Sequence, residues 1–186
     1  MRRFAYADPP YPGRASYYSD DPNAAEVNHE ILIGSLELSY PDGWALSTSV
    51  SGLSACLPFI TVPWHVGAWC KTNPQPYAGQ RWLRSWEPVI FGSVDTAGKP
   101  TVRDWFSSST PRRKGQSGLN GSSLLGSKPP QFCNWLLLMF GFREGDTIDD
   151  LFPGSGVLSA QVERMRQTPG LFDNDWKTPT DDTLDR

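Results

Sequence analysis

Asp8, Pro9, Pro10 and Tyr11 are the residues whose types and spacing most clearly suggest chemistry. They follow residues 4–7, in which large and small apolar side chains alternate as in a short strand. Two successive prolines stiffen the chain, so the Asp8 carboxylate, the Pro9 carbonyl and the Tyr11 ring can share one small volume at little entropic cost. This corner suits a flat ring with an amino group, which would donate to Asp8 and Pro9 while the ring stacks on Tyr11. An ordinary proline-rich turn is the alternative interpretation.

A second candidate site lies near the other end of the sequence. A short strand is predicted over residues 146–152, followed by the turn Pro153-Gly154-Ser155-Gly156 and a helix over residues 157–167. A strand that runs through a Gly-x-Gly turn into a helix lets a ligand approach the backbone closely at the helix N-terminus. On its own this pattern could equally hold a nucleotide.

The sequence resembles the DNA methyltransferases that transfer a methyl group from S-adenosylmethionine to an amino group, chiefly N6 of adenine. Asp8-Pro9-Pro10-Tyr11 resembles their DPPY motif. Lys128-Pro129 before an apolar helix and Asp150-x-Phe-x-Gly-x-Gly resemble their two cofactor motifs, and this order matches the circularly permuted β-type enzymes. The resemblance covers residues 3 to about 165. Two further segments resemble the arms of the terminal hairpin of the family, namely Trp69-Cys70-Lys71-Thr72-Asn73 and Glu87-Pro88-Val89-Ile90.

The resemblance implies a role for each matching residue. Asp8, Pro9, Pro10 and Tyr11 would be catalytic, and the strands that end at Asp8 and Phe152 would lie side by side at the centre of the sheet, sharing one crevice. Family strands that follow the glycine turn have no counterpart here, so the fold is expected to be truncated at the C-terminus. The cofactor would be held by Ala7, Asp8, Lys128, Asp150, Phe152, Pro153, Gly154, Ser155, Gly156 and, as the acid for the ribose hydroxyls, Asp173, with Asp175 as the alternative acid.

The predicted fold is α/β, a Rossmann-like methyltransferase sheet that is mostly parallel with an antiparallel hairpin. The first helix is expected to bury Val27, Ile31, Leu32 and Leu36 on one face. The predicted helices cover residues 24–38, 52–60, 131–142 and 157–167, and the predicted strands cover residues 4–7, 44–49, 62–71, 86–92 and 146–152.

Residues 93–127 lack an apolar period, so we predict a flexible basic loop at the position of the family's target-recognition segment. Residues 99–128 carry six bases and one acid, a local charge of +5, although the whole chain has a net charge of −3. Residues 173–186 form an acidic tail. The basic segment could bind DNA phosphates, and a solvated linker is the alternative. The predicted DNA-binding residues are Arg14, Tyr17, Lys71, Arg112, Arg113 and Lys114.

Length and composition limit the other possibilities. A chain of 186 residues with 38% hydrophobic content fits one domain over residues 1–186. Three scattered cysteines and two isolated histidines argue against a disulfide framework and against a metal site. No apolar stretch approaches the ~20 residues that cross a bilayer, so we expect no membrane partner and a cytoplasmic protein, or one of the host cytoplasm if the source is viral.

The sequence therefore predicts a DNA methyltransferase that modifies adenine N6, with S-adenosylmethionine as cofactor and DNA as partner. Methylation of cytosine N4 is one alternative, because cytosine offers the same amino geometry. A non-catalytic relic of the fold that binds DNA or cofactor is another. A homodimer is also an open alternative, since a second subunit could supply the walls that the adenine pocket lacks. The small size suits a compact, phage-like form of the enzyme.

Overall fold

In the part of the chain that the structure describes, six strands form one sheet in the order β5-β3-β4-β2-β1-β6. The computed structural model describes residues 1–13, 26–74, 76, 79, 81–95, 97, 101–110 and 128–167. Strand β1 is parallel to β2 and β6, and β3 is parallel to β5, whereas β4 is antiparallel to both of its neighbours, β2 and β3. The strands are β1 (Arg3–Ala7), β2 (Trp44–Ser47), β3 (Trp64–Lys71), β4 (Trp86–Gly92), β5 (Trp105–Ser108) and β6 (Thr147–Asp150).

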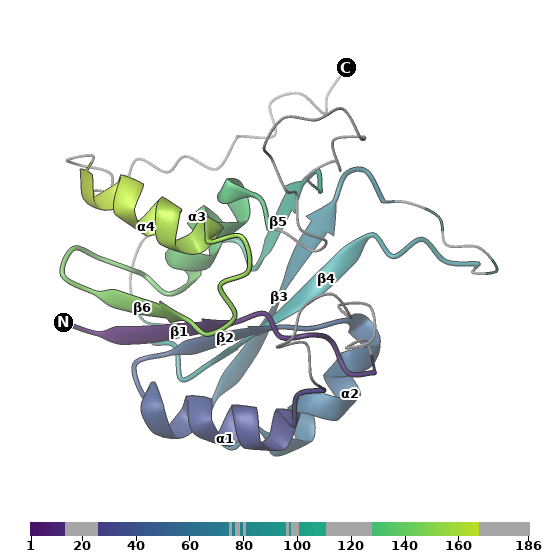
Figure 1. The fold of residues 1–186 in the computed structure, drawn as a ribbon, viewed down its shortest axis with the longest axis horizontal. Coiled ribbons are helices and arrows are strands. Elements are labelled where there is room, and N and C mark those ends of the chain that lie inside the picture. The colour runs from purple at the N-terminus through teal and green to yellow at the C-terminus, as the bar shows by residue number, and fades with distance from the viewer. Residues whose placement is uncertain are drawn as a thin grey trace.

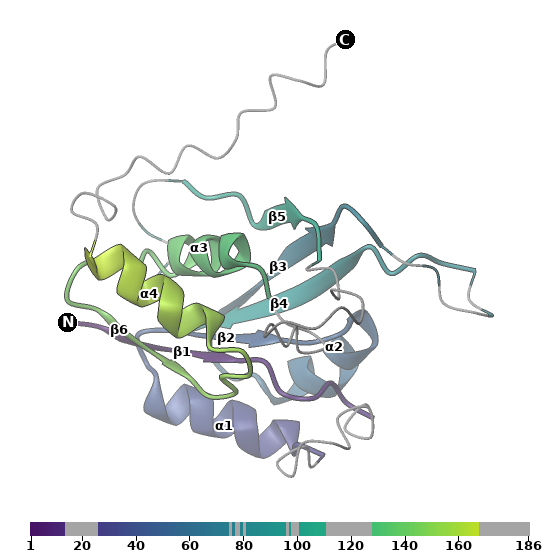
Figure 2. The ribbon, with the colours of Figure 1, turned by 45° about the horizontal axis from the view of Figure 1, so that its top comes forward.

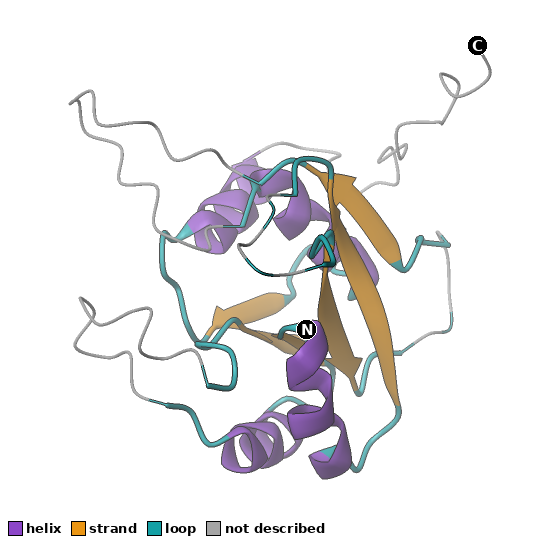
Figure 3. Ribbon diagram, turned by 90° about the vertical axis from the view of Figure 1, so that its right-hand side faces the viewer, coloured by secondary structure: helices purple, strands orange, loops and turns teal. Residues whose placement is uncertain are grey.

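Helices cover both faces of the sheet (Figure 1). Helices α1 and α2 lie on one face, and α3 and α4 lie on the other. Figure 3 shows the same layers from the side, with helices on both sides of the twisted sheet. The helices are α1 (His29–Ser39), α2 (Leu53–Cys56), α3 (Pro130–Met139) and α4 (Val157–Gln167), and the 3₁₀ turns η2 (Val50–Gly52) and η3 (Leu57–Phe59) flank α2.

The β1 strand is buried on both faces because helices cover each side. Phe4 and Tyr6 belong to an aromatic core on the side of α3 and α4, with Phe132 and Phe140 of that layer. Ala5 and Ala7 face the second core, which α1 and β2 complete. Alternating large and small residues in β1 thus serve two different cores, as expected for a strand with both faces covered.

Gly92 is required by a close approach between neighbouring strands. It pairs with Trp44 across β2 and β4, and a Cβ atom at this position would lie 2.1 Å from the Trp44 ring. The Trp44 side chain is fully buried, so its indole has little room to move away.

We therefore expect Gly92→Ala to lower the free energy of unfolding by about 1–3 kcal/mol, the usual cost of overpacking a core. Gly34→Ala is the matched control, because Gly34 lies in α1 with nothing within 4 Å of its Cβ position. Alanine is the better helix former, so this control should gain up to about 1 kcal/mol. Urea unfolding of the two variants measures both effects. A Gly92→Ala variant as stable as the parent would show that the Trp44 ring can be displaced.

Three predictions about the fold need correction. Residues 93–127 contain strand β5, which pairs with the edge of β3, so this part of the expected loop is ordered in the sheet. Strand β6 lies beside β1 as expected, but it is the outermost strand of the described sheet and not a central one. Helix α1 buries Ile33 and Leu36, whereas Ile31 is 66% exposed, so the predicted buried face was partly wrong.

The antiparallel hairpin was predicted correctly. Strands β3 and β4 pair from Trp64↔Gly92 to Cys70↔Trp86. The start of β1 is fixed to β6 by Arg2, whose guanidinium donates to the buried Asp146 carboxylate at 2.6 and 3.1 Å. These contacts help to hold the first strand of the chain beside one of the last.

Candidate active site

Residues from distant parts of the chain lie together at one edge of the sheet, namely the edge formed by the carboxyl ends of the parallel strands. The parallel strands β1, β2 and β6 all end at this edge, at Ala7, Ser47 and Asp150. Because β4 is antiparallel to β2 and β3, its first residues and the last residues of β3 lie at the same edge. The corner after β1, the turn after β6 and the connected end of the β3–β4 hairpin therefore face a common region (Figure 1).

Asp8 forms a buried ion pair with Lys128. The Lys128 ammonium donates to both carboxylate oxygens of Asp8, at 2.9 and 2.8 Å. The Lys128 side chain is only 8% exposed and the Asp8 side chain 20%. The ammonium also lies 5.7–5.8 Å from the ring centres of Tyr11, Trp69 and Phe132, where the faces of aromatic rings attract a cation.

Glu87 extends this pair into a network. The Tyr11 hydroxyl donates to Glu87 Oε2 at 2.9 Å, and the Lys71 ammonium donates to Glu87 Oε1. Lys128 lies 3.6 Å from Glu87 Oε2 and 3.4 Å from the Tyr11 hydroxyl, so it joins the two halves. We call Asp8, Tyr11, Lys71, Glu87 and Lys128 the Asp8 cluster. Its two lysines balance its two carboxylates.

Within the cluster, each charged group favours the ionised form of its oppositely charged neighbours, which opposes the effect of burial on their pKa values. Burial raises the pKa of Asp8, although the Lys128 charge opposes this rise. Burial would also raise the pKa of Glu87, but the charges of Lys128 and Lys71 outweigh it and hold that pKa below its usual range. For Lys128, burial alone would lower the pKa, and the Asp8 charge is the main reason why it is raised instead. Lys128 is thus a permanent cation at neutral pH.

Asp150 lies at the end of β6, next to β1. It pairs with Tyr6 in the register of the two strands, and the following backbone N–H, that of Leu151, donates to the Tyr6 carbonyl at 2.9 Å. Burial raises the pKa of Asp150 to about 6, a hydrogen bond from the Phe152 backbone opposes the rise, and the Asp8 charge adds to it. Asp150 Oδ1 is buried and has no hydrogen-bond partner among the described residues. This side chain can therefore accept a hydrogen bond from a bound group.

The turn after β6 has the backbone geometry that its glycines predicted. Gly154 has φ of 47° and Gly156 has φ of 70°, a left-handed conformation that favours glycine. The Gly156 carbonyl accepts from the Ala160 N–H at 3.0 Å, in the first turn of α4. A Cβ atom at Gly156 would meet nothing within 4 Å, so the chain conformation requires this glycine and crowding does not.

The structure brings most of the predicted site residues to this edge. Asp8, Tyr11 and Lys128 form the centre of the cluster. Asp150 ends the neighbouring strand β6, and the Gly154–Gly156 turn follows that strand. Lys71, predicted to contact DNA, is paired with Glu87 in the cluster, and its contact with DNA stays a prediction. Outside the described residues lie Arg14, Tyr17, Arg112, Arg113, Lys114 and Asp173.

Glu87 is the residue of the site that the sequence analysis missed. It was recognised only as part of a hairpin arm, yet it contacts two lysines and Tyr11. Its position offers a signal, because a carboxylate beside a run of apolar strand residues is costly to bury without a partner. Such a position in the sequence indicates that a cation lies near the carboxylate. Which residue supplies the cation depends on the register of the paired strands.

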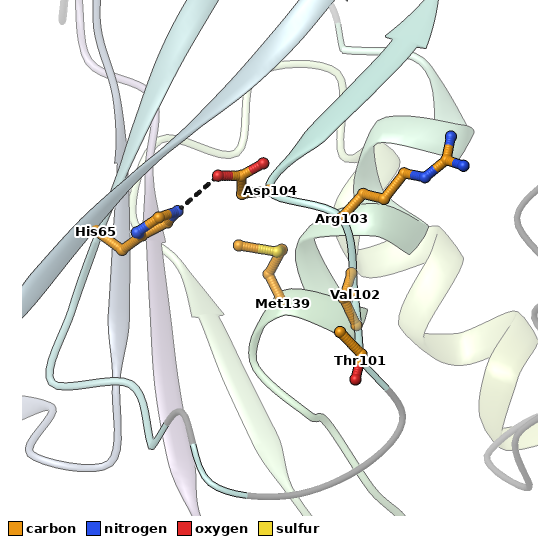
Figure 4. A pocket seen from close by; sticks show the side chains of 6 residues that line it. All are labelled: His65, Thr101, Val102, Arg103, Asp104 and Met139. Carbon is orange, nitrogen blue, oxygen red and sulfur yellow. Dashed lines mark hydrogen bonds and ion pairs between the residues drawn. The ribbon is translucent and has the colours of Figure 1, made fainter.

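A separate open groove of about 460 Å³ lies at the opposite edge of the sheet (Figure 4). It begins where β3 starts, and His65 there lies 3.2 Å from Asp104 with both side chains more than half exposed. The groove is remote from the Asp8 cluster, so it is not part of the candidate site. Its lining residues are His65, Thr101, Val102, Arg103, Asp104 and Met139.

Within the described part of the chain, no three His, Cys, Asp or Glu side chains are placed to bind one metal ion. None of the described helices combines the length and the apolar character needed to span a membrane.

Solved structures show a similar fold, whereas no protein-family model and no curated protein sequence matches the chain. The crystal structure of the M1.HpyAVI-SAM complex has a TM-score of 0.56 and 16% sequence identity, over 89% of this chain and 80% of that chain. The crystal structure of M1.HpyAVI alone has a TM-score of 0.54 and 15% identity, over 87% and 76%. The chain therefore shares the mixed α/β fold of these two structures, and the predicted α/β class, a mostly parallel sheet with an antiparallel hairpin, is confirmed.

Proposed function

We propose that the protein transfers a methyl group from S-adenosylmethionine to the exocyclic amino group of a base in DNA, at N6 of adenine. One observation carries this proposal. The corner at Asp8–Tyr11 and the glycine turn after Asp150 follow two neighbouring parallel strands and lie at one edge of the sheet. A site for the amine and a site for the methyl donor would thus be adjacent, as the reaction requires.

The residues at this edge fit the proposed cofactor. Asp150 Oδ1 is a buried acceptor that lacks a partner within the described structure, and it suits the ammonium group of the methionine end. The glycine turn leaves its backbone free of side chains at the start of α4, where a ligand can approach closely. When bound, S-adenosylmethionine supplies an electrophilic methyl group. We propose that it is held by Ala7, Asp8, Lys128, Asp150, Phe152, Pro153, Gly154, Ser155 and Gly156, with Asp173 at the ribose.

Asp8 would orient the target amine. Lys128 occupies one hydrogen-bonding direction at each carboxylate oxygen, and each ionised oxygen has a second lone pair available for a substrate N–H. The Pro9 carbonyl would accept the other amino hydrogen. An amino group inside a base stack cannot reach such a corner, so the base must be flipped out of the duplex.

Tyr11 would form the stacking surface for the flipped base. Its hydroxyl is held by Glu87, and this hydrogen bond fixes one end of the ring. A ring that is fixed before the base arrives loses less entropy on binding. Arg112, Arg113 and Lys114 remain our proposed phosphate contacts, and Arg14, Tyr17 and Lys71 our proposed contacts near the base.

The test is to incubate the purified protein with labelled S-adenosylmethionine and mixed-sequence genomic DNA, then to digest the DNA and identify the labelled nucleoside. We expect N6-methyladenine. Labelled N4-methylcytosine would assign the other base. Cofactor binding by calorimetry without any methylated nucleoside would overturn the proposed activity and favour a binding protein.

A further inference from the structure

The connection between β3 and β4 exposes large aromatic and aliphatic side chains beside the candidate site. Trp82 is 76% exposed and Leu83 56%, and Trp86, the first residue of β4, is 37% exposed. A tryptophan side chain buries about 150–250 Å² when it is packed, so a ring this open has most of its surface available to a partner. Figures 1 and 2 both show the coloured segment that leads into β4 extending away from the helices that cover the sheet.

Basic residues flank the exposed ring. Arg81 stacks over the Trp82 ring with its guanidinium carbon 5.6 Å from the ring centre, and Arg84 follows two residues later. Residues 81–86 contain two arginines and no acid, which gives this segment a charge of +2. An aromatic surface between two arginines is complementary to nucleic acid, because bases stack on the ring and phosphates attract the guanidinium groups.

The backbone ties this segment to the Asp8 cluster. The Lys71 N–H donates to the Ser85 carbonyl at 2.7 Å, and the Ser85 N–H donates to the Leu83 carbonyl at 3.0 Å. Three residues span at most about 11 Å, so the Trp82 Cα lies within about 11 Å of the Ser85 Cα. Lys71, on the other side of that hydrogen bond, belongs to the cluster that includes Tyr11. Trp82 is therefore joined by a short backbone path to the cluster that contains Tyr11.

We infer that Arg81, Trp82, Leu83 and Arg84 form a duplex-opening element, in which Trp82 stacks against the bases left behind when the target base is extruded. This inference rests on the proposed function. Base extrusion leaves an unstacked gap, and apolar side chains inserted between base steps compensate part of that cost. Arg81 and Arg84 bind the flanking phosphates. The element acts on duplex DNA, and a single strand has no partner base whose stack must be repaired.

The test compares Trp82→Ala with Trp64→Ala. Trp64 is the matched control, because it is 49% exposed and starts β3 at the opposite edge of the sheet. We expect Trp82→Ala to reduce methyl transfer to duplex DNA by about tenfold or more, which corresponds to one lost stacking contact. Transfer to the single strand of the same sequence, S-adenosylmethionine affinity and all properties of Trp64→Ala should change less than about twofold. Trp82→Phe should retain most of the duplex activity.

The arginines are tested by the salt dependence of duplex affinity, measured by fluorescence anisotropy. The double variant Arg81→Gln/Arg84→Gln should lower the log-log salt slope by about 1.8, or about 0.9 for each lost phosphate contact. An unchanged slope would overturn the phosphate-binding role.

Several outcomes would overturn the role of Trp82. Equal activity loss on duplex and single strand, or no loss on the duplex, contradicts it. A Trp82→Ala variant that sediments as a monomer where the parent is a dimer would assign the ring to an interface between copies. If the parent methylates no DNA, the proposed function fails, and duplex affinity still decides the inference: Trp82→Ala must bind the duplex more weakly than Trp64→Ala does.

Discussion

Asp8→Asn should reduce methyl transfer by about 100- to 1,000-fold, the range found when one preorganised hydrogen-bonding group is removed from an active site. The substitution keeps the size of the side chain but replaces a carboxylate oxygen with an amide donor, which cannot accept from the target amine. S-adenosylmethionine affinity should change little, since Asp8 would hold chiefly the amine. The measurement is kcat on genomic DNA together with calorimetry of the cofactor.

Asp149→Asn is the matched control for this experiment. Asp149 is also a carboxylate of the β1–β6 region, but it binds Arg3 and Tyr40 away from the cluster. This variant should retain parental activity. Asp8 would be assigned to the cofactor half of the site if Asp8→Asn lost cofactor affinity in proportion to activity.

The pH dependence of the parent provides a second check on Asp8. Burial raises the pKa of Asp8, and in the proposed function the carboxylate is the form that would accept the amine hydrogen. Activity should therefore fall as the pH is lowered through a window above the ordinary aspartate pKa of about 4. An acid limb at or below that ordinary value would contradict the role of a buried Asp8.

Lys128→Met should give the largest loss of stability, about 3–5 kcal/mol of unfolding free energy at pH 7. The substitution leaves the Asp8 and Glu87 carboxylates without the cation that links them, in a site where the lysine was 8% exposed. Protonation of these carboxylates at lower pH removes the uncompensated charge. The deficit relative to the parent should therefore shrink as the pH falls, and urea unfolding at pH 7 and pH 5 measures this difference.

A double variant separates charge from packing. Lys128→Met/Asp8→Asn removes both charges of the ion pair, so it should be more stable at pH 7 than Lys128→Met alone. If the double variant is as unstable as the single one, the loss comes from packing of the lysine stem against the aromatic rings and not from the unpaired carboxylate.

The two turns of the candidate site were predictable from the sequence, because the conformation of each turn depends on its own residues. The two prolines after β1 and the glycines after β6 restrict or relax the backbone by themselves, so the sequence located both turns. Strand β5 was missed because its Trp-Phe-Ser-Ser sequence has only two large apolar residues, and its place depends on pairing with the β3 edge. Pairing between distant strands is not visible in a local pattern.

The contacts within the Asp8 cluster were also not predictable from local sequence patterns. Glu87 and Lys71 were both noticed, but they were assigned to a hairpin arm and to DNA. Their contact follows from the β3–β4 register, in which Trp69 lies opposite Glu87. A shift of one residue would turn each side chain to the other face of the sheet. The fold was therefore predictable from motifs, whereas the pairing of the buried charges required the register.

The ion pair between Asp8 and Lys128 also sets an order of events during synthesis. The two residues are 120 positions apart. A ribosome adds about 5–20 residues per second, so Lys128 is made about 6–24 s after Asp8. Throughout that interval the nascent chain presents an acid without its cation and a first strand without β6 beside it. The candidate site is thus assembled late, and a polypeptide interrupted before Lys128 contains Asp8 but lacks the cation that pairs with it.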